Sequence, residues 1–140
     1  MPQTLFYILK GQAKVLNGQY DVSIVTSSGD EVSRIIAREG VAVYSIEMSR
    51  KISLARDFVS LFKLTKLFLK LRPDIVHSYT PKAGLLTMLA AFFAKVGVRV
   101  HTFTGLIFPS RSGFSRALLI ATDKLTCLCA TAVVAESAGV

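Results

Sequence analysis

The sequence predicts an α/β domain built on a doubly wound parallel sheet. Short runs rich in β-branched residues alternate with longer apolar or amphipathic segments of helical length. Glycines and small polar residues separate these segments, as is typical of turns between strands and helices. Hydrophobic residues make up 51% of the 140 residues, which excludes a disordered tail and suffices for one domain with a core.

The elements follow one another in a regular order. The expected elements are helix 5–16, strand 20–26, helix 31–39, strand 41–46, helix 54–72, strand 74–77, helix 81–95, strand 98–103, helix 115–128 and strand 131–135. Because a helix opens the chain, the first strand of the doubly wound order is expected to be missing from the middle of the sheet.

Local signals justify the elements of the first half. Apolar residues recur at helical spacing from Leu5 to Leu16, and Asn17-Gly18 is a typical helix end. β-Branched residues mark the strand at 20–26. Asp30 is a suitable N-cap for the next helix, and Gly40 is a suitable end before the strand at 41–46.

The long helix at 54–72 interleaves phenylalanines and leucines with cations. Its cations are Arg56, Lys63, Lys66, Lys70 and Arg72. One interpretation is a crossover helix whose lysines extend into solvent. The other is a basic, aromatic-bearing helix that lies against anionic lipid. Both hold together if one side covers the sheet and the outer edge faces a membrane.

A strand, a tight turn and a helix start define the central stretch, residues 74–86. Asp74 to His77 is short and apolar, which suits an interior parallel strand. Thr80 is a suitable N-cap for a helix that begins at Pro81. Lys82 then stands in the first helical turn, where a cation beside backbone N–H groups predicts an anion site. The alternative is an ordinary turn with a solvated lysine.

The helices and strands of the second half continue the alternation. Gly97 ends the apolar helix that follows the central stretch, and β-branched residues mark the strand at 98–103. The segment at 107–114 predicts a loop. The last helix and strand are followed by the turn at 136–140, where the alternation expects another helix.

Charge and composition restrict the class of partner. The formal net charge of +8 predicts an anionic partner, such as lipid, nucleic acid or a phosphorylated substrate. A flavodoxin-like or nucleic-acid-binding α/β domain is an alternative that rests on charge alone, because neither a G-x-G-x-x-G motif nor a P-loop is present. No apolar run reaches the roughly 18 residues of a membrane span, and no signal peptide is visible, so a soluble or peripheral chain is expected. Cys127 and Cys129 lack zinc or redox spacing and are predicted to be buried structural thiols.

Two segments carry a resemblance to a known family. The run Asp74 to Leu86, continued by Met88-Leu89-Ala90-Ala91, and the run Arg99 to Leu106 resemble the amino-terminal domain of family 4 glycosyltransferases. These are GT-B enzymes that build surface polysaccharides and other lipid-linked glycans. The resemblance extends over essentially all 140 residues. It implies a Rossmann-like, acceptor-side domain of a two-domain architecture, truncated at both ends and without its donor-binding domain.

The resemblance also implies a reaction. A sugar, expected to be UDP-linked, would pass from a nucleoside diphosphate sugar to a lipid-linked glycan, with retention at the anomeric carbon. The alternative is a non-catalytic, membrane-docked half of a two-chain glycosyltransferase. Neither reading needs a cofactor or a metal, because the nucleotide sugar is a co-substrate, and neither involves nucleic acid. The expected partners are the acceptor, an anionic membrane surface and a donor-binding domain, with the chain cytoplasmic and peripheral at the inner face of the cell membrane. The 140 residues alone are expected to be inactive.

The implied site lies at the carboxyl ends of the strands. Acceptor and phosphate binding falls to Ser27, Ser28, Gly29, Arg50, Thr80, Lys82, Thr104 and Gly105, and the catalytic candidates are His77 and Tyr79. Relatives often have histidine where Tyr79 and Thr104 stand. Tyrosine, with an ordinary pKa of ~10, is a poor base at neutral pH. Taken singly, His77 also fits a strand-end histidine with a backbone partner, and Arg50 fits a solvated loop cation.

Overall fold

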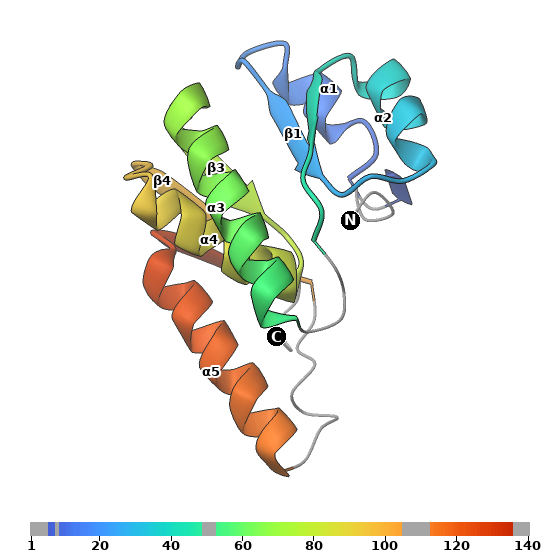
Figure 1. Ribbon diagram of the computed structural model, residues 1–140. Helices are drawn as coiled ribbons and strands as arrows, with labels where there is room; N and C mark the ends of the chain where they lie inside the picture. Colours follow the sequence, from blue (N-terminus) through green and yellow to red (C-terminus); the bar gives the residue numbers. More distant parts are fainter. Residues whose placement is uncertain (1–5, 8, 49–52, 105–112, 136–140) are drawn as a thin grey trace. The chain divides into compact units, whose positions relative to one another are not determined.

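The computed structural model describes residues 6–7, 9–48, 53–104 and 113–135 (Figure 1). The chain divides into two compact units, Met1–Ile52 and Ser53–Val140, and each is described by itself. Within the described ranges, no helix is both long enough and apolar enough to cross a membrane.

The first unit is a two-stranded parallel sheet with two helices. Its elements are α1 (Gln12–Leu16), β1 (Ser23–Thr26), α2 (Glu31–Glu39) and β2 (Ala42–Ser45). Strands β1 and β2 pair in parallel, from Ser23 opposite Ala42 to Thr26 opposite Ser45. The small core consists of three buried side chains, Ile24, Ile35 and Val41, with partly buried hydrophobic residues packed against them.

A buried carboxylate joins the two helices of this unit. Glu39, at the end of α2, is 2% exposed. Its Oε1 accepts the Gly11 N–H at 2.9 Å and its Oε2 accepts the Lys14 N–H at 3.1 Å. Its Oε1 also accepts the Arg38 Nε–H at 2.6 Å. Burial alone would raise the pKa of Glu39, but these hydrogen bonds and the Arg38 charge together lower it.

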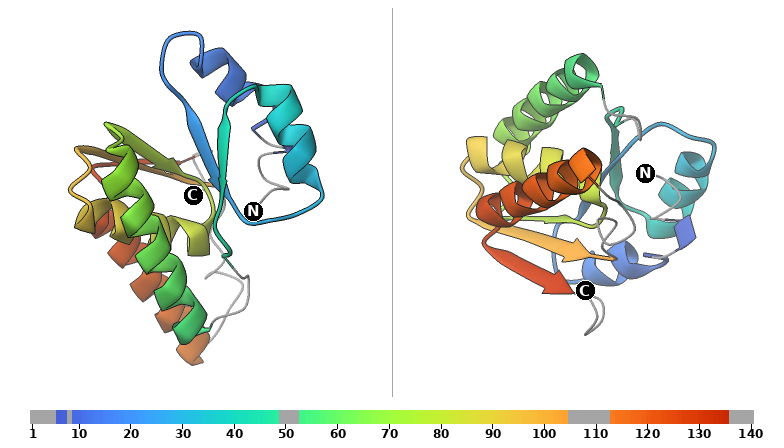
Figure 2. Two further views of the ribbon diagram at one scale, coloured as in Figure 1. Left: turned by 45° about the horizontal axis from the view of Figure 1, so that its top comes forward. Right: turned by 90° about the horizontal axis from the view of Figure 1, so that it is seen from below.

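The second unit is a three-stranded parallel sheet covered by three helices. Its elements are α3 (Leu54–Leu71), β3 (Ile75–Ser78), α4 (Pro81–Phe93), β4 (Val98–Phe103), α5 (Gly113–Cys129) and β5 (Ala132–Ala135). The strand order is β3-β4-β5. Helix α4 contacts β3 and β4 and packs against both α3 and α5. The three helices lie on one face of the sheet (Figure 2).

Helix α4 is central in this unit because its sequence is apolar almost all round. Five of its residues are buried: Gly84, Leu86, Met88, Ala90 and Ala91. Its small residues permit close helix and strand neighbours, and the adjacent strand contributes buried Val76. The strands β3 and β4 therefore pack against a largely buried helix, and α4 begins directly after the carboxyl end of β3.

The fold class is confirmed: the chain is α/β with parallel strands. The described strands form two sheets rather than one.

Two predictions of detail are wrong. Among the described residues the first α-helix begins at Gln12 and not further upstream, because Gly11 has a left-handed backbone with φ 78°, which interrupts a continuous helix. The prediction of two buried thiols fails for Cys127, which is exposed, whereas Cys129 is buried. Residues two apart on a helix point to different sides, so both could not enter one core.

Candidate functional site

Three polar side chains form a hydrogen-bonded chain near the carboxyl ends of β3 and β4. His77 lies on β3, Tyr79 directly follows that strand, and Thr102 lies on β4. The Tyr79 hydroxyl is 3.0 Å from His77 Nδ1, and His77 Nε2 is 2.8 Å from Thr102 Oγ1. The Tyr79 ring also stacks on the His77 ring, with centroids 4.2 Å apart. The chain follows from the register, which places His77 opposite Val100 and Thr102 two residues further along β4.

Partial desolvation shifts the pKa values of His77 and Tyr79 in this hydrogen-bonded chain. Partial desolvation lowers the pKa of His77 and raises the pKa of Tyr79. At neutral pH the imidazole is therefore uncharged and the phenol keeps its proton. A neutral imidazole donates from one ring nitrogen and accepts at the other, so His77 donates to one of the two hydroxyls and accepts from the other. The group is suited to binding neutral hydroxyls, and its tyrosine is unsuited to act as a base.

A second, buried pair of polar side chains, Ser78 and His101, lies beside this hydrogen-bonded chain on the same two strands. His101 of β4 is 0% exposed, and its Nδ1 is 2.8 Å from the Ser78 hydroxyl. Its Nε2 is buried without a hydrogen-bond partner among the described residues. A Cβ added to Gly84 of α4 would lie 2.3 Å from His101 Cε1. This contact was not predicted from the sequence, where a glycine inside a helix is the one available signal.

Lys82 forms an ion pair with Asp57, which was not predicted from the sequence. Its Nζ is 2.8 Å from Asp57 Oδ1 on α3, and both side chains are about four-fifths buried. The Ser53 N–H donates to the other oxygen of Asp57 at 3.2 Å. Lys82 is therefore partly neutralised, and the solvated lysine of the alternative interpretation is not what the structure contains.

Thr80 is at the predicted N-cap position before Pro81. Its backbone is extended, with φ −109°, but its side chain makes no capping hydrogen bond. Its carbonyl oxygen accepts the Gly84 N–H at 2.5 Å, which is the first hydrogen bond of the helix. Thr104 follows β4 and is half-buried, whereas Arg50 and Gly105 lie outside the described residues.

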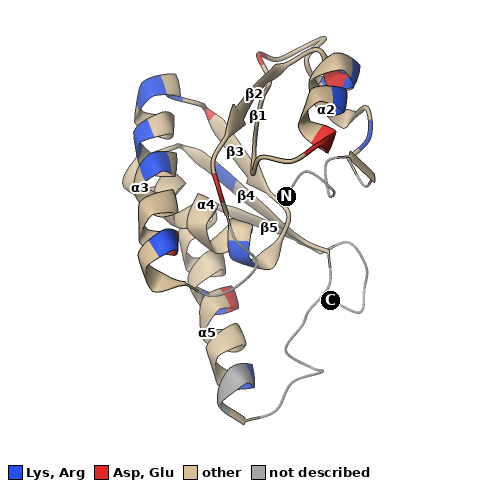
Figure 3. Ribbon diagram, turned by 45° about the vertical axis from the view of Figure 1, so that its right-hand side comes forward, with Lys and Arg blue, Asp and Glu red and all other residues tan. Residues whose placement is uncertain are grey.

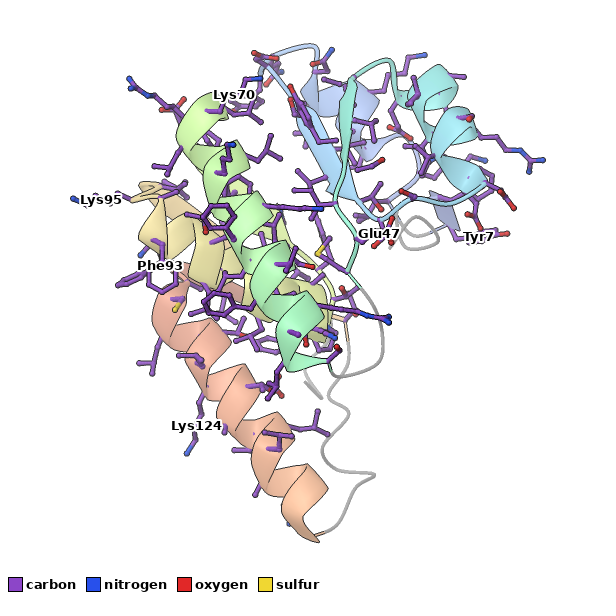
Figure 4. The ribbon with its side chains drawn as sticks, viewed as in Figure 1. Tyr7, Glu47, Lys70, Phe93, Lys95 and Lys124 are labelled. Atoms are coloured by element: carbon purple, nitrogen blue, oxygen red, sulfur yellow. The ribbon has the colours of Figure 1, made fainter. Side chains whose placement is uncertain are left out.

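Ser27, Ser28 and Gly29 follow β1 in the first unit. The Ser27 hydroxyl accepts the Met48 N–H at 3.1 Å and donates to the Met48 carbonyl at 3.4 Å. It is buried and joins the ends of β1 and β2. Ser28 and Gly29 are exposed. The Ser28 N–H donates to Glu47 Oε1 at 2.9 Å (Figure 4). This N–H group, which could bind a phosphate, is therefore already hydrogen-bonded to a carboxylate.

Within the described part of the chain, no cluster of three or more His, Cys, Asp or Glu residues is placed to hold a metal ion. The groups that the second unit places near its carboxyl-end edge are thus hydroxyls, an imidazole and a paired lysine. This set can bind sugar hydroxyls and an anionic group.

Comparison with known proteins agrees with this chemistry. The glycosyl transferase 4-like domain family matches residues 9–140. A capsular polysaccharide biosynthesis glycosyltransferase, CapM, from Staphylococcus aureus is 37% identical over 131 residues, covering 93% of this chain and 34% of that protein. The UDP-Gal:alpha-D-GlcNAc-diphosphoundecaprenol alpha-1,3-galactosyltransferase of Escherichia coli is 34% identical over 94 residues, covering 67% of this chain and 24% of that protein. The chain therefore spans about a third or less of the length of these relatives.

Proposed function

The chain belongs to the glycosyl transferase 4-like family, and we propose that it forms the acceptor-side part of a glycosyltransferase of surface polysaccharide biosynthesis. The reaction is transfer of a sugar from a nucleoside diphosphate sugar, UDP-linked by analogy with the galactosyltransferase relative, to a lipid-linked glycan. The donor-binding domain is supplied by the same protein or by a partner chain. The names of both relatives support this assignment.

The observation that carries the proposal is the chain of Tyr79, His77 and Thr102. A neutral imidazole whose orientation is fixed on both sides offers directional hydrogen bonds without repelling or attracting charge. An acceptor sugar hydroxyl binds here by donating a hydrogen bond to the Tyr79 hydroxyl oxygen, while Tyr79 keeps its contact with His77. The role is one of positioning the acceptor, since Tyr79 stays protonated at neutral pH.

Lys82 supplies the charge for the phosphate groups of the acceptor. It stands in the first turn of α4, where backbone N–H groups favour anions. An acceptor diphosphate must compete with Asp57 for this lysine. Asp57 thereby keeps the buried cation satisfied when no acceptor is bound.

The proposed location is peripheral, at the inner face of the cell membrane. The E. coli relative is named for an acceptor on diphosphoundecaprenol, which is a membrane lipid. The net charge of +8 favours association with an anionic lipid surface.

Substitution of Tyr79 tests the proposal. We expect Tyr79→Phe to weaken binding of a short-chain, water-soluble diphosphate-linked sugar about 3- to 10-fold, because one hydrogen bond is lost while the ring stack remains. Isothermal titration calorimetry measures the affinity. The matched control is Tyr20→Phe, since Tyr20 is 60% exposed on the turn before β1. Equal affinity of wild type and Tyr79→Phe would remove Tyr79 from the acceptor site.

A further inference from the structure

The solvent-facing side of α3 carries a row of large apolar residues. Leu54 is 83% exposed, Phe58 73%, Phe62 66% and Leu69 56%. With about 100° between successive helical residues, these four span an arc of roughly 80°. We call them the apolar stripe. A separate side of α3, centred roughly 120° from the stripe by the same geometry, is buried through Ser60, Leu64 and Phe68, and α3 packs against α4. The stripe is therefore not part of the core of this unit.

A row of cations runs directly beside the apolar stripe. We call it the cationic stripe, and its members are Arg56, Lys63, Lys66 and Lys70. The same helical geometry places them on a neighbouring arc of roughly 80°. All four are exposed, and no ion pair found among the described residues involves them. Figure 3 shows the blue positions distributed along α3, and Figure 4 labels Lys70 near its end.

We propose that these two stripes of α3 form the surface by which the protein docks on an anionic lipid bilayer. The inference rests on the proposed function, because a lipid-linked acceptor brings the protein to a membrane. It adds which surface of the protein contacts the membrane and which residues form that surface. The apolar stripe enters the boundary between headgroups and acyl chains. The lysines beside it extend their aliphatic stems and place their charges among the anionic headgroups.

The combination of the two stripes selects a bilayer over other anionic partners. Nucleic acid would satisfy the cationic stripe through its phosphates but would leave the leucines and phenylalanines in water. An anionic bilayer accommodates both stripes at once, because its polar and apolar layers are adjacent. The charge complementarity and the apolar area thus point to one occupant.

Vesicle sedimentation with the full chain tests the proposal. The vesicles contain phosphatidylglycerol and phosphatidylcholine, with pure phosphatidylcholine as the uncharged comparison. We expect the wild type to bind the anionic vesicles and Lys63→Gln/Lys66→Gln/Lys70→Gln to bind roughly 100-fold more weakly, at about fivefold per lysine. The double variant Phe58→Ser/Phe62→Ser is expected to lose about tenfold or more through lost insertion.

Matched controls separate the location of the charge from its amount. Lys10→Gln/Lys95→Gln/Lys124→Gln changes the net charge by the same three units at exposed positions outside α3, two of which Figure 4 labels. Leu128→Ser/Val15→Ser removes two apolar side chains that are 79% and 77% exposed. Circular dichroism establishes that each variant is folded. We expect both controls to bind the vesicles like the wild type.

The proposal fails if the control variants lose as much binding as the α3 variants, since net charge alone would then explain binding. It also fails if a DNA duplex is bound more tightly than the vesicles with the same dependence on the α3 lysines. If wild type binds the water-soluble acceptor but no vesicles, the docking surface is refuted and the acceptor-site proposal stands. If it binds vesicles through α3 but not the acceptor, docking is supported and the acceptor site is refuted.

Discussion

Gly84 is the residue on which the packing of α4 against β4 depends most directly. Its missing side chain leaves room for the His101 ring, which would otherwise be 2.3 Å from a Cβ. We expect Gly84→Ala to lower the free energy of unfolding by about 1–3 kcal/mol, because His101 is 0% exposed and cannot move aside without disturbing its neighbours. Urea denaturation measures the change.

A second glycine provides the control for this prediction. A Cβ added to Gly97 would meet nothing within 4 Å, so Gly97→Ala should leave the free energy of unfolding nearly unchanged. If steric conflict with the imidazole is the cause, Gly84→Ala should cost less when His101 is already alanine. Equal costs in both backgrounds would refute the contact as the cause.

His101 makes stability depend on pH. Burial, and next the charge of His77, lower the pKa of His101 below its ordinary value of 6.5. The unfolded chain then binds a proton at a higher pH than the folded chain, so stability is fully present above about pH 6.5 and declines as pH falls toward the folded pKa. The free energy of unfolding, measured by urea denaturation, is expected to be lower at pH 5.5 than at pH 7.5.

The chain contains two histidines, so His77→Gln isolates the contribution of His101. The variant should retain most of the pH dependence, because burial, the larger cause of the lowered His101 pKa, remains when the charge of His77 is removed. Burial raises the pKa of Asp123, so its contribution to the free energy of unfolding increases as pH falls, opposite to that of His101. Asp123 is present in both wild type and His77→Gln. A NMR titration in which His101 shows a pKa above 6.5 would contradict this account.

At the scale of elements, Glu39 connects α2 to the start of α1. Its carboxylate accepts N–H groups from Gly11 and Lys14, which the five-residue helix α1 cannot satisfy internally. Glu39→Ala is expected to lower the free energy of unfolding by about 1–3 kcal/mol, since two partly buried N–H groups at the start of α1 lose their acceptor. The exposed Ser33→Ala on the same helix is the control. A loss of similar size in both variants would mean that Glu39 has no special role.

The strands and helices were largely predictable because their signals are local. β-Branched runs, Gly40 and Gly97 placed most elements within a few residues, and β4 was predicted at its observed bounds. The start of α1 was not, because the prediction weighed apolar spacing from residue 5 and ignored Gly11. The helix start was therefore mispredicted where the left-handed backbone of Gly11 interrupts a periodic apolar pattern.

Some residues of the candidate site were likewise predictable from the sequence, and others were not. His77 and Tyr79 were predictable, since polar residues at the end of a buried strand lie at the edge where such sheets bind ligands. The pairing of Lys82 with Asp57 was not, because the two stand on different helices, 25 positions apart, and meet only when α3 packs on α4. Nor does any sequence pattern state that Gly84 faces an imidazole.

At the scale of the whole molecule, the two units differ in the size of their cores. The first has a two-stranded sheet and a cluster of three buried hydrophobic residues. The second has three strands covered by the largely buried helix α4 and by α3 and α5. Because a two-stranded sheet is marginal without extensive packing, local opening should cost less free energy in the first unit.

Hydrogen exchange followed by mass spectrometry tests this difference. After correction for intrinsic rates, we expect peptides covering β1, α2 and β2 to exchange about tenfold faster, or more, than peptides covering β3, α4 and β4. Glu39→Ala should accelerate the first set further and leave the second unchanged, because its hydrogen bonds lie within residues 11–39. Equal protection of both sets in the wild type would mean that the two units open together, as one cooperative structure.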